Sequence, residues 1–245
     1  MKSFLKLTYM ELKIQLREPV ALFFTLAFPV MVMVLFGFIF GNEAEEVLGG
    51  YGQVDLSVPG YIGMVVGTIG MLSIPTTLAN YRDLGILRRL RATPLGSSPV
   101  LWSQVAAQVV MTAAGIILLF IAGLAIFDLR IPNGNLAIVP AVLLSAFSFF
   151  AVGFVLAGVM PSARTAQAVG MAIFYPMLFL SGAAMPRYIM PDFVQQIAGL
   201  LPLTHVVILM EDLWLKGTWN LASVAVVAAV LILGLVISRF TFRWE

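Results

Sequence analysis

The sequence predicts an all-α membrane protein with six transmembrane helices, built as a single domain over residues 1–245. Apolar residues make up 61% of the chain, and they gather in runs of about 20, the length that spans a bilayer. Charged residues make up only 11%, whereas a soluble domain has about 25%. Such a chain cannot cover itself with polar surface, so its solvent is lipid. This composition excludes a soluble enzyme, a nucleic-acid-binding protein and a disordered chain.

Six apolar runs mark the predicted spans. The first run is interpreted as a retained anchor, because it is too long for the apolar region of a secretory signal and lacks a small-residue cleavage site. No internal repeat is visible, which argues against an inverted-repeat carrier. The predicted spans are residues 19–41, 57–80, 103–127, 136–160, 167–185 and 219–238.

The Lys and Arg residues are distributed unevenly between the two sides of these spans. One side carries only Arg130, Arg187 and Lys216, and the rest of the 14 cationic residues lie on the other side. Because cytoplasmic segments are enriched in Lys and Arg, both termini are expected in the cytoplasm. We therefore expect a multi-pass protein of the plasma or inner cell membrane.

Residues 1–18 are too short to span a bilayer but have the pattern of an amphipathic helix. Their cations fall in a stripe about 60° wide on a helical wheel, and apolar residues occupy much of the rest, interrupted by Glu11 and Glu18. This pattern predicts a helix lying along the cytoplasmic interface, ended by Pro19. The alternative is an ordinary positively charged flank. The cationic stripe consists of Lys2, Lys6, Lys13 and Arg17.

The cytoplasmic segment after the second span, residues 82–94, has a second amphipathic pattern. Three apolar residues share one helical face, three arginines share the other, and Pro94 ends the turn. A short helix with an arginine face can dock on a partner that offers carboxylates, through bidentate pairs. The alternative is a solvated loop that follows the positive-inside rule. The faces are Ile86, Leu87 and Leu90, and Arg82, Arg88 and Arg89.

The run Asp83-x-Gly85-x-Leu87-x-Arg89-Leu90-x-Ala92-Thr93-Pro94 resembles the E-x-G-T-L-x-R-L-x-A-T-P motif of ABC transporter type-2 permeases, the membrane subunits of exporters. Here Asp83 replaces the usual Glu and Ile86 the usual Thr. The resemblance implies that residues 82–94 are the coupling helix, which sits in a cleft of the ATPase subunit and carries its motion into the membrane. The coupling residues would be Arg82, Asp83, Gly85, Leu87, Arg88, Arg89, Leu90, Arg91, Ala92, Thr93 and Pro94.

Residues 186–217 are external by topology yet mostly apolar. Asp192 can cap one short helix, Pro202 breaks it, and Thr204 can cap a second helix that Gly217 closes. Each piece of about 10 residues is roughly 15 Å long, half a bilayer. We therefore expect a re-entrant hairpin, as the resemblance also implies.

An external gate is the functional interpretation of the polar, aromatic and proline residues in this hairpin. The alternative for the acids and Trp214 is an interfacial turn with a tryptophan anchor at head-group depth. A lone histidine such as His205 is more often structural than catalytic. The tentative gate residues are Pro191, Pro202, His205, Glu211, Asp212 and Trp214.

The spans contain almost no ionisable side chain away from their ends, which argues against a proton-coupled carrier, a voltage sensor and an intramembrane protease. The chain has no phosphate-binding G-x-x-x-x-G-K-[ST] loop, no cysteine and one histidine. We therefore expect no catalytic residue, no metal and no directly bound cofactor, with ATP and Mg supplied through a partner ATPase. One face of the second span carries Gly60, Gly63, Gly67 and Gly70, for close packing within the chain or at a subunit seam or substrate path.

The predicted function is that of the transmembrane subunit of an ABC exporter, which is not an enzyme by itself. It moves an amphipathic drug, antibiotic or lipid-like substrate out of the cytoplasm or inner leaflet. The expected partners are a P-loop ATPase, a second permease copy (identical or a paralogue) and membrane lipid, without nucleic acid. The alternatives are a polysaccharide or glycolipid exporter and, from another class, a passive channel or membrane scaffold without an ATPase.

Overall fold

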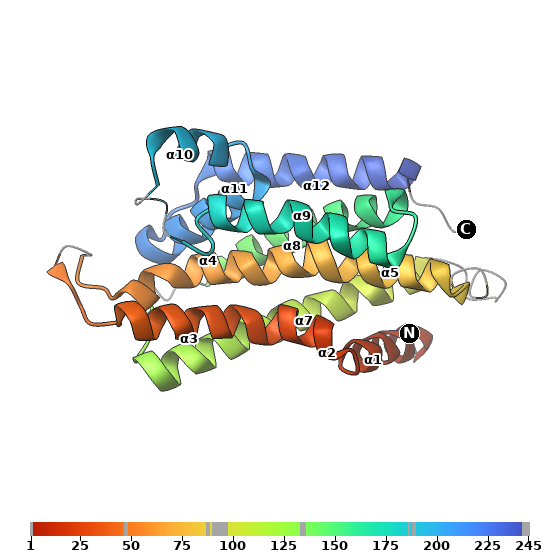
Figure 1. The fold of residues 1–245 in the computed structure, drawn as a ribbon, viewed down its shortest axis with the longest axis horizontal. Coiled ribbons are helices and arrows are strands. Elements are labelled where there is room, and N and C mark those ends of the chain that lie inside the picture. Colours follow the sequence, from red (N-terminus) through yellow and green to blue (C-terminus); the bar gives the residue numbers. More distant parts are fainter. Residues whose placement is uncertain are drawn as a thin grey trace.

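The computed structural model describes residues 2–46, 49–86, 89, 98–132, 136–185, 187 and 190–241. Apart from one isolated β-bridge, the regular elements in these ranges are all helices, and the long ones run along one axis (Figure 1). We call the end of the bundle that holds both chain termini the inner end, and the opposite end the outer end; the names follow the predicted orientation.

Each predicted apolar run coincides with helical structure, with boundaries shifted by a few residues. The helices are α1 (Lys2–Gln15), α2 (Pro19–Leu22), η1 (Phe23–Ala27), α3 (Phe28–Phe40), α4 (Gln53–Thr68), η3 (Ile69–Ser73), α5 (Ile74–Asp83), α7 (Ser98–Phe127), α8 (Ile138–Val159), α9 (Ala163–Leu180), α10 (Asp192–Ala198), α11 (Pro202–Glu211), η5 (Asp212–Lys216) and α12 (Leu221–Thr241).

Five of these segments are long and apolar enough to cross a membrane, or up to six if the bent pair α10 and α11–η5 counts as one span. Helix α9, the predicted fifth span, is not among the five although it has 18 residues. Its first turns carry Arg164 and Gln167, which lower its mean hydropathy. The protein is therefore a multi-pass, all-helical membrane protein with five or six candidate spans.

Two spans contain a π-helical turn that ends two residues before a proline. The turn η1 precedes Pro29 and the turn η3 precedes Pro75. Proline lacks the backbone N–H that would bond the carbonyl four residues earlier, and the wider turn accommodates that gap.

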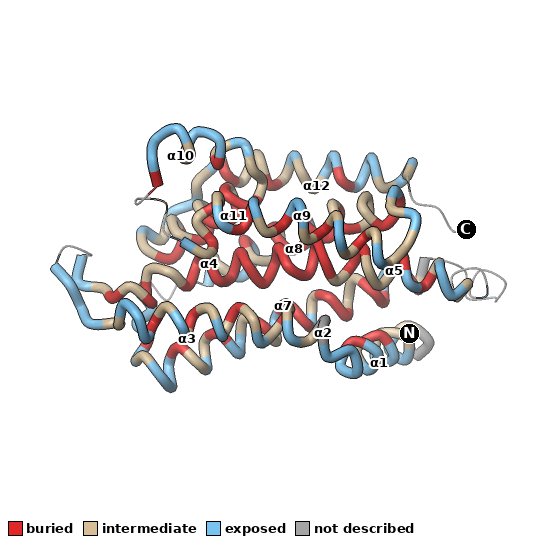
Figure 2. Tube along the Cα trace, in the orientation of Figure 1, coloured by how far each residue is buried: buried red, intermediate tan, exposed pale blue. Residues whose placement is uncertain are grey.

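The segment α4–η3–α5 is the centre of the bundle, and 89% of its most apolar 18-residue stretch is buried inside the chain. Its glycines permit the close packing, because each one faces a neighbour that a side chain would strike. A Cβ on Gly60 would lie 2.9 Å from the Ala183 carbonyl oxygen, and a Cβ on Gly70 would lie 2.6 Å from that of Phe149. The glycine face therefore packs within the chain, the first of the two interpretations (Figure 2).

Substituting two of these glycines is expected to give unequal losses of stability. Gly70→Ala places its methyl group against the Phe149 backbone, which cannot move without shifting α8, so we expect a loss of about 1–3 kcal/mol. Gly63→Ala is the matched control, because its closest neighbour is a side-chain methyl group of Val207 at 3.1 Å and not a backbone atom. Thermal unfolding in detergent micelles measures both. Equal losses would contradict this packing.

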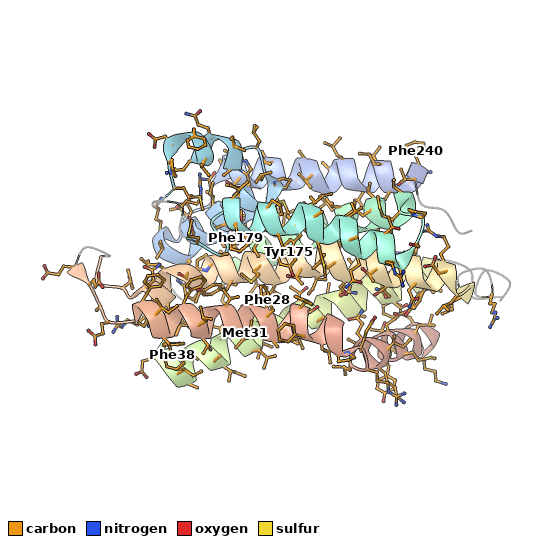
Figure 3. All side chains as sticks on the ribbon, in the orientation of Figure 1. Phe28, Met31, Phe38, Tyr175, Phe179 and Phe240 are labelled. Carbon is orange, nitrogen blue, oxygen red and sulfur yellow. The ribbon has the colours of Figure 1, made fainter. Side chains whose placement is uncertain are left out.

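The surface of the bundle that faces away from its core is largely apolar. Figure 2 shows exposed residues along α3, α7, α10 and α12, and large apolar side chains occupy many of these positions. Phe38 is 73% exposed and Phe240 82% exposed, at opposite ends of the bundle (Figure 3). A soluble monomer does not expose so much apolar surface, so these side chains face lipid or another membrane protein.

The hairpin before α12 consists of α10 and the longer segment α11–η5, which meet at 102°. Two predicted caps are wrong. Pro191, not Asp192, occupies the N-cap position of α10. Pro202 begins α11 instead of only ending the preceding helix, and the buried Thr204 hydroxyl has no hydrogen-bond partner within the described part of the chain. Gly217 closes η5 with φ 68°, as predicted. Re-entry of this hairpin into a membrane remains a prediction.

Candidate functional site

The inner end of α5 is fastened to the end of α8 by Arg82. Its guanidinium donates hydrogen bonds to the Ala157 carbonyl at 3.0 Å and to the Met160 carbonyl. The last carbonyls of a helix lack partners within the helix and carry its negative partial charge, so a guanidinium is well suited to them. The sequence placed Arg82 on an arginine face turned toward a partner, whereas the structure turns it toward α8.

The next residue, Asp83, fastens α5 to the start of α9. Its carboxylate Oδ2 accepts a hydrogen bond from the Ala163 backbone N–H at 2.9 Å, in the first turn of α9. An acidic group is favourable there, because the first N–H groups of a helix lack partners and carry positive partial charge. Arg82 and Asp83 therefore hold both sides of the α8–α9 turn. Gly85 follows with φ 65°, a conformation that favours glycine.

Tyr81 joins α5 to α1. Its hydroxyl donates a 2.6 Å hydrogen bond to Glu11 Oε2, and both side chains are buried. Burial raises the pKa of the Glu11 carboxyl above its ordinary value, and the hydrogen bond from Tyr81 offsets part of that rise. Glu11 was predicted to interrupt the apolar face of α1, but it lies on the face that packs inside the protein. Met10 and Ile14 are exposed instead, where lipid would cover them.

The attachment of α1 is expected to weaken as the pH rises. Because the folded state raises the pKa of Glu11, it binds the proton more tightly than the undocked helix does. The resulting stabilisation is fully present below the ordinary glutamate pKa and is lost as the pH passes the raised value. Hydrogen-exchange protection of α1, corrected for the intrinsic rate at each pH, measures this. Glu11→Gln should remove the pH dependence and the exposed control Glu18→Gln should keep it; the same dependence in both variants would contradict the assignment.

Residues 81–83 thus bring α1, α5, α8 and α9 together at the start of the predicted coupling helix, residues 82–94. Of the predicted coupling residues, the structure describes Arg82, Asp83, Gly85 and the exposed Arg89. The Tyr81 and Glu11 contact was missed, because a helical wheel of α1 does not show what covers it. The other predicted coupling residues lie outside the described residues: Leu87, Arg88, Leu90, Arg91, Ala92, Thr93 and Pro94.

The outer end is organised by Asp55, which sequence analysis did not single out. This fully buried carboxylate accepts hydrogen bonds from Asn42 Nδ2 at 2.9 Å, the Gly52 N–H at 3.0 Å and the Arg130 N–H at 2.9 Å. The Arg130 guanidinium lies 3.6 Å away. Asp55 therefore connects the segment after α3, the start of α4 and the segment after α7. The only sequence signal is its position three residues after Gly52, in the first turn of α4.

Trp214 attaches the hairpin to the same site. Its indole N–H donates a 2.8 Å hydrogen bond to the Asp55 carbonyl oxygen, and its ring packs against Phe120 with centroids 5.8 Å apart. The side chain is 4% exposed. Trp214 is therefore enclosed by the chain, and the interpretation of it as a lipid anchor at head-group depth is wrong.

The remaining predicted gate residues separate into two groups. The His205 ring contacts the Gly199 carbonyl at 2.9 Å and Ser223 Oγ at 3.4 Å, so it connects α10, α11 and α12 as a structural histidine does. Asp212 accepts from Lys216 at 2.7 Å and from Asn220 at 2.8 Å. Pro191 and Pro202 begin the two hairpin helices. Glu211 instead faces a cavity of about 370 Å³ between α4, the residues after α9 and the hairpin. A gating role for these residues remains a prediction.

The described residues contain no group of three His, Asp or Glu side chains that could hold a metal ion. The described residues form a bundle of apolar helices with a polar junction at the inner end and a bent helical hairpin at the outer end. They define a multi-pass membrane protein whose polar contacts join helices at the two ends.

The model of the ABC-2 type transporter family matches residues 2–213, and the chain belongs to this family of transport permeases. The daunorubicin resistance ABC transporter permease protein DrrB1 of Streptomyces coeruleorubidus is 24% identical over 221 residues, 87% of this chain and 76% of that protein. The ycf38 protein of Porphyra purpurea is 26% identical over 210 residues, 83% and 71% of the two chains. Nodulation protein J of Bradyrhizobium diazoefficiens is 34% identical over 88 residues, 36% and 34% of the two chains.

Proposed function

We propose that this chain is the transmembrane subunit of an ATP-driven exporter for an amphipathic drug, antibiotic or lipid-like compound. It works with a separate P-loop ATPase, which binds ATP and Mg, and with a second permease copy. Both termini lie in the cytoplasm, and the compound leaves the cytoplasm or the inner leaflet. Membership of the ABC-2 type transporter family and the similarity to a daunorubicin resistance permease support this proposal.

The observation that carries the proposal is the junction at Tyr81, Arg82 and Asp83. These residues contact α1, the end of α8 and the start of α9, and Arg82 and Asp83 begin the proposed coupling helix, residues 82–94. A partner that moves this segment therefore moves three further helices with α5. Helix α9 ends at Leu180, and Gly182 and Ala183, which follow it, line the outer cavity. The packed helices thus form a continuous path for a conformational change.

In the proposed cycle, ATP closes the ATPase dimer and displaces the coupling helices of both permeases. The junction passes this displacement to α8 and α9, and the cavity between the permeases changes from inward to outward access. A compound that binds the inward and outward states equally tightly does not shift the equilibrium between them. Binding favours one state only through a difference in affinity between the two. The hairpin, proposed to be re-entrant, is the last barrier it passes.

Association with the ATPase tests the proposal. Arg89→Glu combined with Arg91→Glu reverses the charge of the proposed docking face, so recovery of a P-loop ATPase with the purified chain should fall by about tenfold or more. Mass spectrometry of material purified in mild detergent quantifies it. The matched control is Arg17→Glu combined with Arg239→Glu, two exposed cations of the same end. Full ATPase recovery by the first double variant, with normal expression, would contradict the docking assignment.

A further inference from the structure

The cavity at the outer end contains two opposite charges that the proposed cycle does not use. It lies between α4, the residues that follow α9 and the hairpin, and has a volume of about 370 Å³. Arg187 and Glu211 both line it, together with the neutral polar side chains of Ser57 and Gln195. Leu56 and Leu215 add apolar surface to the same cavity. The site therefore combines both signs of charge with an apolar wall.

The side chain of Arg187 lies in space that Gly182 leaves free. Gly182 has φ 93°, and a Cβ at that position would lie 2.6 Å from Arg187 Cγ and 3.0 Å from Cδ. The absence of a side chain at Gly182 thus lets the Arg187 stem lie directly on the backbone. The Arg187 Nε is buried and has no hydrogen-bond partner among the residues that the structure describes. Because guanidinium is a planar group of five donors suited to oxyanions, this geometry leaves a donor for an anionic ligand.

Glu211 supplies the opposite charge from α11. Arg187 and Glu211 line the same cavity, yet the two side chains do not form an ion pair within the described residues. The adjacent Asp212 differs, because Lys216 and Asn220 already pair with it. Arg187 and Glu211 are therefore separated charges that one ligand with both signs can satisfy together. A purely anionic ligand would be repelled by Glu211, and a purely cationic one by Arg187.

We infer that this cavity binds the zwitterionic head of an amphipathic molecule, with its phosphate or carboxylate on Arg187 and its ammonium group on Glu211. Ser57 and Gln195 face the part of the head between the two charges, and the Leu56 and Leu215 surface takes the start of the apolar chain. The inference rests on the proposed function for one point, that the bound molecule is the exported compound at its exit.

Ligand binding to the purified chain in maltoside micelles tests the inference. The probes are lysophosphatidylethanolamine, which carries both charges, lysophosphatidylglycerol, which carries only the negative one, and dodecylammonium, which carries only the positive one. We expect the zwitterion to bind about tenfold more tightly than either other probe, as measured by native mass spectrometry. Glycerophosphoethanolamine, the head group without its chain, is used as a competitor. Full competition assigns the site to the head alone, and weak competition assigns part of the binding to the apolar wall; both outcomes support a zwitterion site.

The variants separate the two charges. Arg187→Gln should reduce zwitterion affinity to that of dodecylammonium, and Glu211→Gln should reduce it to that of lysophosphatidylglycerol. Arg187→Lys keeps the charge without the Nε donor and should give an intermediate affinity, which also guards against a misfolded glutamine variant. The matched control is Asp192→Asn, which removes an exposed charge from the hairpin outside the cavity.

Equal affinity for the three probes, or a zwitterion preference that survives in both Arg187→Gln and Glu211→Gln, would overturn the inference. This assay needs no ATPase, so its failure is distinguishable from failure of the proposed function. A chain that prefers the zwitterion but never associates with an ATPase would keep the site and lose the exporter assignment.

Discussion

Replacing Asp55 with alanine is expected to cost about 3–5 kcal/mol of stability, because each buried donor left unsatisfied costs about 1–3 kcal/mol. The change removes the acceptor for three hydrogen bonds and leaves the Asn42 amide and two backbone N–H groups without their partner. Because the same residue's carbonyl receives Trp214, the hairpin should loosen at the same time. Unfolding monitored by tryptophan fluorescence in micelles measures the loss.

The control for this change is Glu43→Ala, which removes an exposed acid from the same outer segment. Surface changes of this kind usually alter stability by less than about 0.5 kcal/mol. Asp55→Asn keeps the shape but not the charge, so its loss should lie between the two. An Asp55→Ala protein as stable as Glu43→Ala would show that Asp55 does not organise the outer end.

Replacing Arg82 with methionine is expected to detach α5 from α8 while leaving the ATPase bound. The variant keeps most of the side-chain volume but loses both hydrogen bonds to the Ala157 and Met160 carbonyls. Hydrogen bonds to charged groups contribute about 1.5–3 kcal/mol each, so the loss in unfolding free energy should be of that order or greater. Thermal unfolding and ATPase recovery, measured on the same preparation, give the two quantities.

Arg239→Met is the matched control for this variant, since Arg239 is an exposed cation in the last turn of α12 at the same end of the bundle. It should leave both stability and ATPase recovery unchanged. If Arg82→Met loses the ATPase as completely as the Arg89 and Arg91 charge reversal does, Arg82 belongs to the docking face and not to the junction inside the chain.

The sequence was sufficient to predict the long apolar helices, because apolar runs and prolines are local signals, whereas most of the predicted coupling helix lies outside the described residues. It predicted the helices of the hairpin but misplaced their caps, since Asp192 and Thr204 follow prolines that already occupy the start of each helix. Helix α9 shows a further limit. Its polar first turns reduce its mean hydropathy. The residue that contacts the start of this helix, Asp83, belongs to a distant segment, so the local sequence does not show the contact.

The polar contacts at the two ends could not be predicted, because their partners are far apart in the sequence. Glu11 and Tyr81 are 70 residues apart, and Trp214 bonds Asp55 over 159 residues. A single acid on a helical wheel or in a loop gives no sign of such a partner. Glu11 was accordingly interpreted only as an interruption of the apolar face of α1, and Asp55 was not identified as a site residue at all.

The central claim is that motion at the inner junction reaches the outer end, and labelling of a single cysteine tests it most directly. The chain contains no cysteine, so Met185→Cys, beside the outer cavity, gives one labelling site. In the purified complex with its ATPase, trapping with ATP and vanadate should change the maleimide labelling rate of this cysteine severalfold. The same trapping should leave the rate unchanged when Arg82→Met is also present. An equal change with and without Arg82→Met would contradict transmission through the junction.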